Sequence, residues 1–237
     1  AIPDIIADAA IFCGKTGIVD PYEYSRSLQV ASEEKGASFI LNSPILAIER
    51  LSNGVYRIET PRGQIDSEIV VNCAGLHSDE IAMLVGINRY RIYPWRGDYC
   101  RLRSPHRFES LIYPTRAKGA PGLGVHLTLS LDGSYRLGPD AHPARDKTDF
   151  SIPETIEAKK IQFFDAARTY LRRLSIDQLQ YDSCGIRPKL RSPEDTDEKD
   201  FVLSEDLPGF INLIGIESPG LTAAIDLAER TAQLVKG

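Results

Sequence analysis

Near the end of the chain, the pattern of hydrophobic and polar residues changes from a continuous apolar run to helical spacing. An apolar run at 211–216 meets Ser218, Pro219 and Gly220, and apolar residues then recur at helical spacing. This pattern predicts a strand that enters a helix through a turn of small residues. The first N–H groups of such a helix have no partner within it and lie at the positive end of its dipole. The turn is therefore a candidate site for an anion or a polarised oxygen.

The clearest helix signal lies near the start of the chain. Asp20 can cap the helix, Pro21 suits its first position, Glu23 completes a capping box, and Gly36 can end it. These residues predict a helix between Asp20 and Gly36.

The pattern changes between this helix and the final strand. We expect a strand at 37–42 and a hairpin that turns at 61–63, whose second arm ends in a buried run at 69–73. From 88 to 183, alternating segments separated by Pro and Gly indicate an antiparallel sheet, and a helix with an apolar stripe interrupts them at 154–174. This order predicts a mixed α/β fold in which a sheet domain is inserted into a nucleotide-binding domain.

Composition narrows the classes of function. The 237 residues, 42% hydrophobic and 26% charged, suit one or two globular domains. A net charge of -5 with dispersed Lys and Arg argues against a nucleic-acid partner. Four widely spaced cysteines without a CxxC pair argue against a zinc site or a disulfide framework and favour a cytoplasmic location. No apolar run is long enough to cross a bilayer, so any membrane contact would be peripheral.

Two short segments are candidates for ligand contact. In "VVNCAGLHSD", Ala74 and Gly75 would let the backbone approach a ligand, although a tight strand-to-helix turn is the commoner explanation. In "CGIRPKL", Arg187 stands between Gly185 and Pro188. Most arginines lie on the surface, but a guanidinium held in place is a natural two-pronged partner for a carboxylate.

His126 is the candidate base. It lies in a predicted strand where Gly124 and Thr128 share its face. A strand histidine is more often structural, yet a neutral imidazole in a pocket can accept a proton near pH 7. We expect no metal site, because three further histidines have no partner at ligand spacing: His77, His106 and His142. The 18 glycines include no G-x-G-x-x-G, so spacing alone supports no dinucleotide site.

Taken in order, the motifs resemble those of one enzyme superfamily. They are "GIVDP", "IVVNCAGLHSD", "YPWRGDY", "LIYPT", "GLGVHLTLSLDG", "GPD", "CGIRPKL", "DFVL" and "NLIGIESPGLTAA". They resemble the FAD-dependent D-amino acid oxidase superfamily, and within it the L-2-hydroxyglutarate dehydrogenases and oxidases. The resemblance implies an FAD domain with a Rossmann-like core at 17–87 and 185–237. It also implies a substrate domain with a mainly antiparallel sheet at 1–16 and 88–184.

The resemblance also implies a reaction and its residues. Members of this branch oxidise a 2-hydroxy acid: a hydride leaves the α-carbon for the flavin, and the hydroxyl proton goes to a base. Arg187 would hold the substrate carboxylate, His126 would be the base or hydroxyl partner, and Tyr113 would also bind substrate. The FAD would be contacted by Ala74, Gly75, Leu76, Arg96, Gly97, Gly185, Ile186, Ser218, Pro219, Gly220, Leu221 and Thr222. The helix after this last turn would stabilise negative charge on the reduced flavin.

The sequence departs from the superfamily at its start. Members begin with a βαβ unit whose G-x-G-x-x-G turn binds the FAD pyrophosphate, and the sequence contains no such turn. We therefore expect an incomplete FAD domain that exposes apolar surface, which self-association, a separate N-terminal chain or a rearranged edge would cover. One alternative function is oxidation of an amino acid or secondary amine, against which His126 counts. The other is a non-catalytic subunit that binds a partner chain.

A dicarboxylate substrate would need a second cation besides Arg187. Candidates in the sequence are Arg116, Lys118 and Lys189. Neither the identity of the hydroxy acid nor the electron acceptor, oxygen or a quinone, follows from the sequence.

Overall fold

The computed structural model describes residues 4–105, 107–115, 124–197 and 199–236. The chain divides into two compact units. Unit 1 comprises Ala1–Ser25, Arg96–Ala144 and Thr148–Ile186, and unit 2 comprises Arg26–Trp95, Arg145–Lys147 and Arg187–Gly237. Two strands, β5 (Tyr93–Leu102) and β9 (Leu179–Lys189), contribute residues to both units. Two of the unit borders therefore fall within strands, whereas sequence analysis placed the domain borders at 17, 88 and 185.

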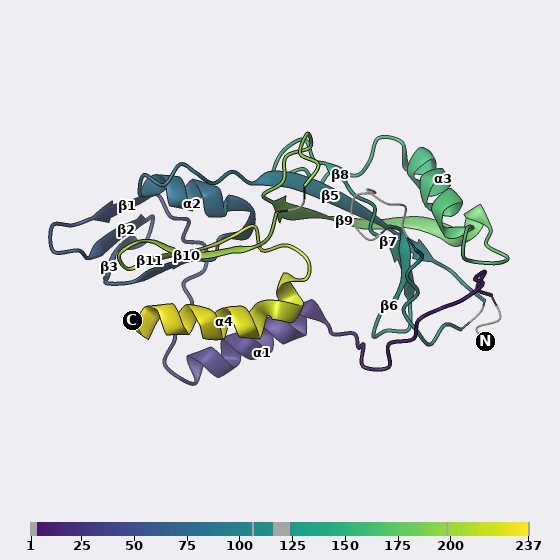
Figure 1. Ribbon diagram of the computed structural model, residues 1–237, viewed down its shortest axis with the longest axis horizontal. Helices are drawn as coiled ribbons and strands as arrows, with labels where there is room; N and C mark the ends of the chain where they lie inside the picture. Colours follow the sequence, from purple (N-terminus) through teal and green to yellow (C-terminus); the bar gives the residue numbers. More distant parts are fainter. Residues whose placement is uncertain (1–3, 106, 116–123, 198, 237) are drawn as a thin grey trace. The chain divides into compact units, whose positions relative to one another are not determined.

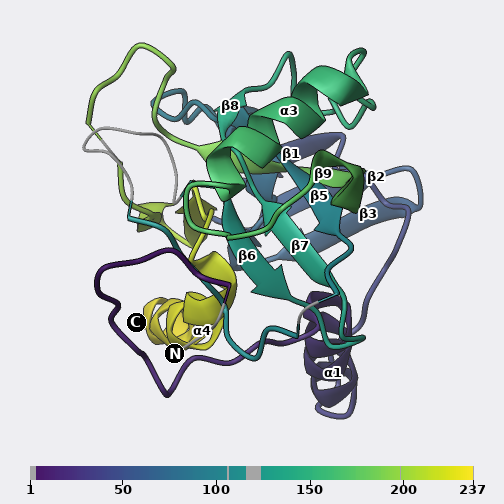
Figure 2. The same ribbon diagram turned by 90° about the vertical axis from the view of Figure 1, so that its right-hand side faces the viewer.

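Unit 1 is built on a sheet with a helix packed on one face. The sheet has the order β6 (His126–Leu129), β7 (Tyr135–Gly138), β5, β8 (His142–Pro143), and β9 pairs with β5. β6, β7 and β5 are antiparallel neighbours, as Figure 2 shows. Leu127, Leu137 and Cys100 lie opposite one another in these strands and are fully buried in one core with Phe163 of α3 (Ile156–Ala167).

The helix predicted at 154–174 is present but shorter. α3 ends at Ala167, and the chain then forms a β-bridge between Leu171 and Ile5. Arg173 has a φ of 63°, which no α-helix accommodates. The apolar residues beyond Ala167 are thus buried by a turn rather than by a longer helix. A short 3-10 helix, η2 (Ile176–Gln178), precedes β9.

Unit 2 contains a parallel strand pair. β4 (Val70–Asn72) lies parallel to β11 (Phe210–Ile214), which is antiparallel to β10 (Val202–Leu207). Figure 1 shows α2 (Ser78–Leu84) and α4 (Gly220–Lys236) on either side of these strands. A second, antiparallel sheet contains β1 (Ala47–Arg50), β2 (Tyr56–Thr60) and β3 (Gly63–Ser67). The predicted hairpin at 61–63 and the final strand, turn and helix are confirmed.

The capped helix near the start of the chain is also confirmed. α1 (Pro21–Glu33) begins directly after Asp20, whose carboxylate accepts the N–H groups of Tyr22 at 2.9 Å and Glu23 at 3.0 Å. Gly36 follows the helix with a φ of 91°, a left-handed conformation that suits glycine at a helix end.

The strand predicted at 37–42 is wrong. This segment forms no strand, and Phe39, Ile40 and Leu41 are 49%, 52% and 70% exposed. A strand needs a neighbour to pair its N–H and C=O groups, and no described strand pairs with this segment.

The buried run predicted at 69–73 also differs from expectation. β3 ends at Ser67, and β4 joins the sheet of β10 and β11 rather than the hairpin. β4 is the edge strand of that sheet, and the side chain of Val71, on one of its faces, leaves the residue 38% exposed. The run therefore separates from the hairpin and is only partly buried.

Unit 2 exposes many apolar side chains, which confirms the expectation of exposed apolar surface. Most come from the second half of α1, the segment 39–46, β4 and α4: Leu28, Val30, Phe39, Ile40, Leu41, Ile45, Leu46, Val71, Leu221, Ile225, Leu234 and Val235. Among the described residues, no helix has both the length and the apolar character that crossing a bilayer requires. All four cysteines are free thiols.

Candidate functional site

The carboxyl ends of β4 and β11 lie side by side, because Val70–Asn72 pairs in parallel with residues 210–212. β4 leads into a 3-10 helix, η1 (Gly75–His77), and β11 leads through 215–219 into α4. Ligands of open α/β sheets bind at this edge. The fold therefore brings the predicted segments 74–76 and 218–222 to one edge of one sheet.

Glycine is required at two positions in the second turn. A Cβ on Gly220 would lie 2.6 Å from the Cγ2 atom of Ile216, and one on Gly215, whose φ is 70°, would lie 2.7 Å from Leu190. Ser218 and Pro219 are exposed between these glycines. The turn before α4 is thus closely packed on its inner side and open on its outer side.

A groove of about 650 Å³ runs along α4 beside these turns. It is lined by Cys73, Gly75, Leu213, Ile216, Gly220, Ala224, Leu227, Ala228, Thr231, Ala232, Val235 and Lys236. Among the described residues, the lining is mostly small and apolar, with Lys236 as its one charged residue. FAD contacts of the two predicted segments beside this groove stay predictions.

Two buried asparagines connect the strands behind this edge. The amide of Asn72 donates to the Oδ1 atom of Asn212 and to the carbonyl of Ser78, both at 2.7 Å. The amide of Asn212 donates in turn to the Oδ2 atom of Asp206 at 2.7 Å. The Oδ1 atom of Asn72 accepts the N–H of Ala74 at 3.2 Å. This chain of hydrogen bonds ties the first predicted cofactor segment to the sheet.

The predicted carboxylate clamp lies in β9. Arg187 is partly buried there, and β9 pairs with β5. Gly185 and Ile186 precede it in the same strand but belong to unit 1, whereas Arg187 belongs to unit 2. Contacts of these three residues with substrate or cofactor stay predictions.

Lys189 is held within unit 2. Its Nζ atom lies 3.0 Å from the Oε1 atom of Glu217, and 5.8 Å from the ring centre of Trp95. Glu217 directly precedes the turn at 218–222, so this ion pair links β9 to that turn. The other predicted second cations, Arg116 and Lys118, lie outside the described residues.

His126 is held in one orientation in unit 1. It opens β6, is 7% exposed, and its Nδ1 atom lies 2.9 Å from the carbonyl oxygen of Gly124. Because a carbonyl can only accept, Nδ1 carries the proton and Nε2 is the acceptor of the neutral ring. Tyr113 stacks on the imidazole with ring centres 4.2 Å apart. The structure thus brings two predicted substrate residues, His126 and Tyr113, together.

Arg96 is engaged inside unit 1. Its guanidinium donates to the carboxylate of Asp98 at 2.9 and 3.0 Å and to the carbonyls of Asp149 at 2.9 Å and Ser151 at 2.6 Å. Arg96 is 4% exposed and ties β5 to the loop between β8 and α3. A cofactor contact in this segment would therefore involve the backbone at Gly97.

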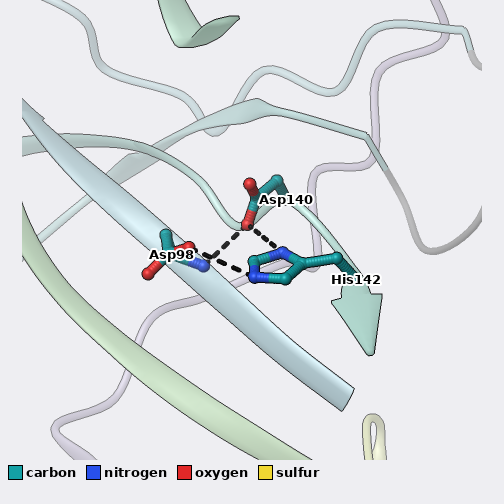
Figure 3. Close-up of side chains that lie close together, drawn as sticks. All are labelled: Asp98, Asp140 and His142. Carbon is teal, nitrogen blue, oxygen red and sulfur yellow. Dashed lines mark hydrogen bonds and ion pairs between the residues drawn. The ribbon is translucent and has the colours of Figure 1, made fainter. Parts of the chain in front are cut away.

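A polar cluster lies on the core side of the same sheet, where Asp98, Asp140 and His142 gather (Figure 3). Their candidate ligand atoms lie within 4.8 Å of one another. The Nζ atom of Lys159, however, lies 3.0 Å from Asp98 and 2.7 Å from Asp140. Together with Arg96, this ammonium balances both carboxylates, so the cluster needs no metal ion to offset its charge.

We expect Asp140→Asn to cost stability in a pH-dependent way. Burial would raise the pKa of Asp140, but hydrogen bonds from His142, Lys159 and the Asp98 N–H lower it from 3.8 to about 2. A lowered folded-state pKa stabilises the fold above pH 3.8, and this contribution disappears as the pH falls towards 2. In urea unfolding, Asp140→Asn should cost about 2 kcal/mol at pH 7 and almost nothing near pH 2.

The matched control is Asp165→Asn on α3, whose side chain is 54% exposed. It should change stability little at either pH. A loss for Asp140→Asn that is the same at both pH values would contradict the electrostatic origin of the effect.

Comparison with known proteins places this geometry in a family. The family model described as "FAD dependent oxidoreductase" matches residues 2–234. The chain belongs to this family. It is 33% identical over 219 residues to a glycerol 3-phosphate dehydrogenase of Caloramator mitchellensis, covering 91% of the chain and 43% of that protein. It is 27% identical over 267 residues to the L-2-hydroxyglutarate dehydrogenase of Escherichia coli K12, covering 99% of the chain and 63% of that protein.

Solved structures agree on the fold. The FAD-bound L-α-glycerophosphate oxidase of Mycoplasma pneumoniae superimposes with a TM-score of 0.75 at 22% identity over 90% of this chain and 55% of its own. Glycine oxidase of Geobacillus kaustophilus gives 0.71 at 18% identity over 90% and 53%. The family model confirms the family and the FAD dependence predicted from the motifs. The chain spans roughly half the length of the proteins it matches.

Sequence analysis did not single out Asn72, Asn212 or Asp206. The available signal was one asparagine inside each of two apolar runs, "IVVNCAG" and "FINLIG". A polar residue buried in such a run needs a hydrogen-bond partner, and each asparagine partners the other.

Burial would raise the pKa of Asp206, but hydrogen bonds from Ser204 and Asn212 bring this pKa below its ordinary value.

Proposed function

We propose that the protein oxidises a 2-hydroxy acid similar to L-2-hydroxyglutarate. The observation that carries the proposal is the geometry of His126, whose Nδ1 atom lies 2.9 Å from the carbonyl oxygen of Gly124, so that Nε2 is the proton-accepting nitrogen of the neutral imidazole. Oxidation of a hydroxyl group removes a proton from oxygen as well as a hydride from carbon, so it needs a base. The L-2-hydroxyglutarate dehydrogenases among the relatives support this substrate class.

Each residue has one proposed part in the reaction. FAD, when bound, supplies the hydride acceptor. Arg187 holds the substrate carboxylate through two parallel hydrogen bonds. The Nε2 atom of His126 takes the hydroxyl proton, and the Gly124 carbonyl stabilises the resulting imidazolium through Nδ1–H. The substrate loses one hydride and one proton and leaves as a 2-oxo acid.

A second candidate substrate is glycerol 3-phosphate. The 33% identity with a glycerol 3-phosphate dehydrogenase favours it. Glycerol 3-phosphate is also a secondary alcohol with an anionic group, so the same base serves. The two substrates differ in their anionic groups: L-2-hydroxyglutarate has two carboxylates, and glycerol 3-phosphate has one phosphate.

Absorption spectroscopy of the purified chain tests the proposal. After incubation with FAD and removal of the excess, a stoichiometric visible flavin band would support a cofactor site within this chain. Anaerobic L-2-hydroxyglutarate should bleach this band, and sn-glycerol 3-phosphate is the competing substrate. A protein that stays colourless would contradict catalysis by this chain on its own.

Arg187→Ala is expected to slow bleaching by the 2-hydroxy acid roughly 100-fold or more, because two charge-assisted hydrogen bonds are lost. The rate is measured anaerobically over a range of substrate concentrations. Arg230→Ala removes an arginine on α4 whose side chain is 64% exposed and serves as the control. Unchanged bleaching by Arg187→Ala would contradict the carboxylate clamp.

A further inference from the structure

The sheet face that carries His126 also carries two arginines that the proposed reaction does not use. Thr128, Arg136 and Arg101 lie directly opposite one another across β6, β7 and β5. Their sequence neighbours, such as the fully buried Leu127, point into the core that contains α3. Because successive side chains of a strand alternate, Arg101 and Arg136 share the other face with His126.

Arg136 is a diagonal neighbour of His126. His126 pairs with Gly138, which lies two residues after Arg136 in β7. Diagonal side chains in an antiparallel pair start roughly 7–8 Å apart, a span that a small molecule with two functional ends can bridge. Gly138 has a φ of 127°, and a Cβ there would lie 2.8 Å from the carbonyl oxygen of Asp98, so the residue paired with His126 is restricted to glycine.

The positive charge of the two arginines exceeds the negative charge of the one carboxylate that contacts them. The Nε atom of Arg136 lies 2.9 Å from Asp182, and the Nη2 atom of Arg101 lies 3.3 Å from it. Within the described part of the chain, Asp182 is the one carboxylate in an ion pair with either guanidinium. The arginine side chains are 42% and 44% exposed, whereas that of Asp182 is 13% exposed. Two cations therefore share one anion and keep accessible donors.

The field of this pair extends over the neighbouring turn. Hydrogen bonds from Ser134 lower the pKa of Asp132, and the charges of Arg101 and Arg136 lower it further. Like charges directly opposite each other in a sheet are unfavourable, so the pairing of Arg101 with Arg136 has a cost that the carboxylate of Asp182 partly offsets.

We propose that Arg101 and Arg136 bind the second anionic group of the substrate, the one remote from the reacting carbon. The inference rests on the proposed function for the reacting end at His126. Guanidinium groups match carboxylate and phosphate oxygens with paired N–H donors, and Asp182 holds both in place. The ligand is thus a hydroxylated small molecule with a distal oxyanion, either carboxylate or phosphate. Lys189, which pairs with Glu217, is then not the second cation.

Direct binding to the 237-residue chain is measured by NMR. The probes are glutarate and inorganic phosphate, with butyrate as the anion that has no second charge. Glutarate or phosphate is expected to shift the arginine Nε–H signals and the Thr128 amide saturably, whereas butyrate is not. The double variant R101Q/R136Q should lose this shift. R168Q, which removes an exposed arginine on the helix side of the sheet, should keep it. A wild type without the shift, or a double variant that retains it, would overturn the proposal.

Substrate discrimination is measured by flavin bleaching. R136Q is expected to raise the half-saturating concentration of L-2-hydroxyglutarate roughly 10- to 100-fold and to leave that of L-2-hydroxybutyrate unchanged. R136K, which keeps the charge, should recover part of the loss. An effect confined to L-2-hydroxyglutarate assigns a carboxylate to this site, and one confined to glycerol 3-phosphate assigns a phosphate. Equal weakening for hydroxyglutarate and hydroxybutyrate would overturn the inference.

The two proposals fail in different ways. If the NMR shift is present but none of these alcohols bleaches the flavin, the proposed function fails and the anion site stands. If hydroxyglutarate bleaches the flavin but R136Q changes nothing, the proposed function stands and the anion site is wrong.

Discussion

Replacing His126 with glutamine is expected to slow flavin reduction by the 2-hydroxy acid roughly 10²- to 10⁴-fold, the usual contribution of a general base. Glutamine can still donate to the carbonyl of Gly124, which now lies 2.9 Å from the Nδ1 atom of His126. It cannot take up the hydroxyl proton. The rate is measured by anaerobic stopped-flow absorbance as a function of pH. The wild-type rate should fall at acid pH, where the imidazole is protonated, and His126→Gln should lose this dependence.

A second histidine of the same unit provides the control. His142→Gln changes the cluster at Asp98 and Asp140, on the core side of the sheet, and should leave the rate within about twofold. The tautomer of His126 has its own readout, because ¹⁵N chemical shifts distinguish Nδ1–H from Nε2–H in a chain with four histidines. An Nε2–H tautomer, or a His126→Gln variant that keeps the wild-type rate and pH profile, would show that another group is the base.

Local chemistry explains which elements could be predicted from the sequence. Asp20 and Gly36 cap the two ends of α1 and act only on residues close to them in sequence. Their pattern therefore predicts this helix directly. The turn at 61–63 and the strand, turn and helix around Gly220 depend equally on neighbouring residues. The segment 37–42 also has an extended pattern, but whether it becomes a strand depends on a distant partner. Local pattern therefore predicts conformation better than it predicts pairing.

The same distinction separates the site residues that were predicted from those that were missed. His126, Arg187 and Gly75 stand in motifs, and a motif can be read from one stretch of chain. Asn72 and Asn212 lie 140 residues apart, and only the parallel pairing of β4 with β11 brings their amides together.

Arg101 and Arg136 belong to no motif at all. They share a face with His126 because of the register of β5, β7 and β6. A shift of one residue in that register would move a strand's side chains to the opposite face. Single-sequence reasoning thus found candidate reacting groups but not the tertiary contacts that hold or complement them.

Asn212→Leu is expected to lower the free energy of unfolding by about 3 kcal/mol. Asn212 is fully buried, and the substitution removes the donor at 2.7 Å from Asp206 and the acceptor at 2.7 Å from the amide of Asn72. An anion and an amide are then left inside the protein with fewer partners, and leucine supplies no polar group to replace them. Urea unfolding at pH 7 measures the change through the fluorescence of Trp95, the single tryptophan, which lies in the same unit.

Asn212→Leu should also affect the predicted cofactor segment at 74–76, because the side chain of Asn72 accepts the N–H of Ala74. Hydrogen exchange of that amide is expected to accelerate in Asn212→Leu, because the side chain of Asn72 loses the contact that orients it. Asn88→Leu makes the same substitution at an exposed position of unit 2 and should cost less than about 0.5 kcal/mol. If Asn212→Leu were no more destabilising than Asn88→Leu, the asparagine pair would not be what joins β4 to β11, and the exchange rate at Ala74 should then be unchanged as well.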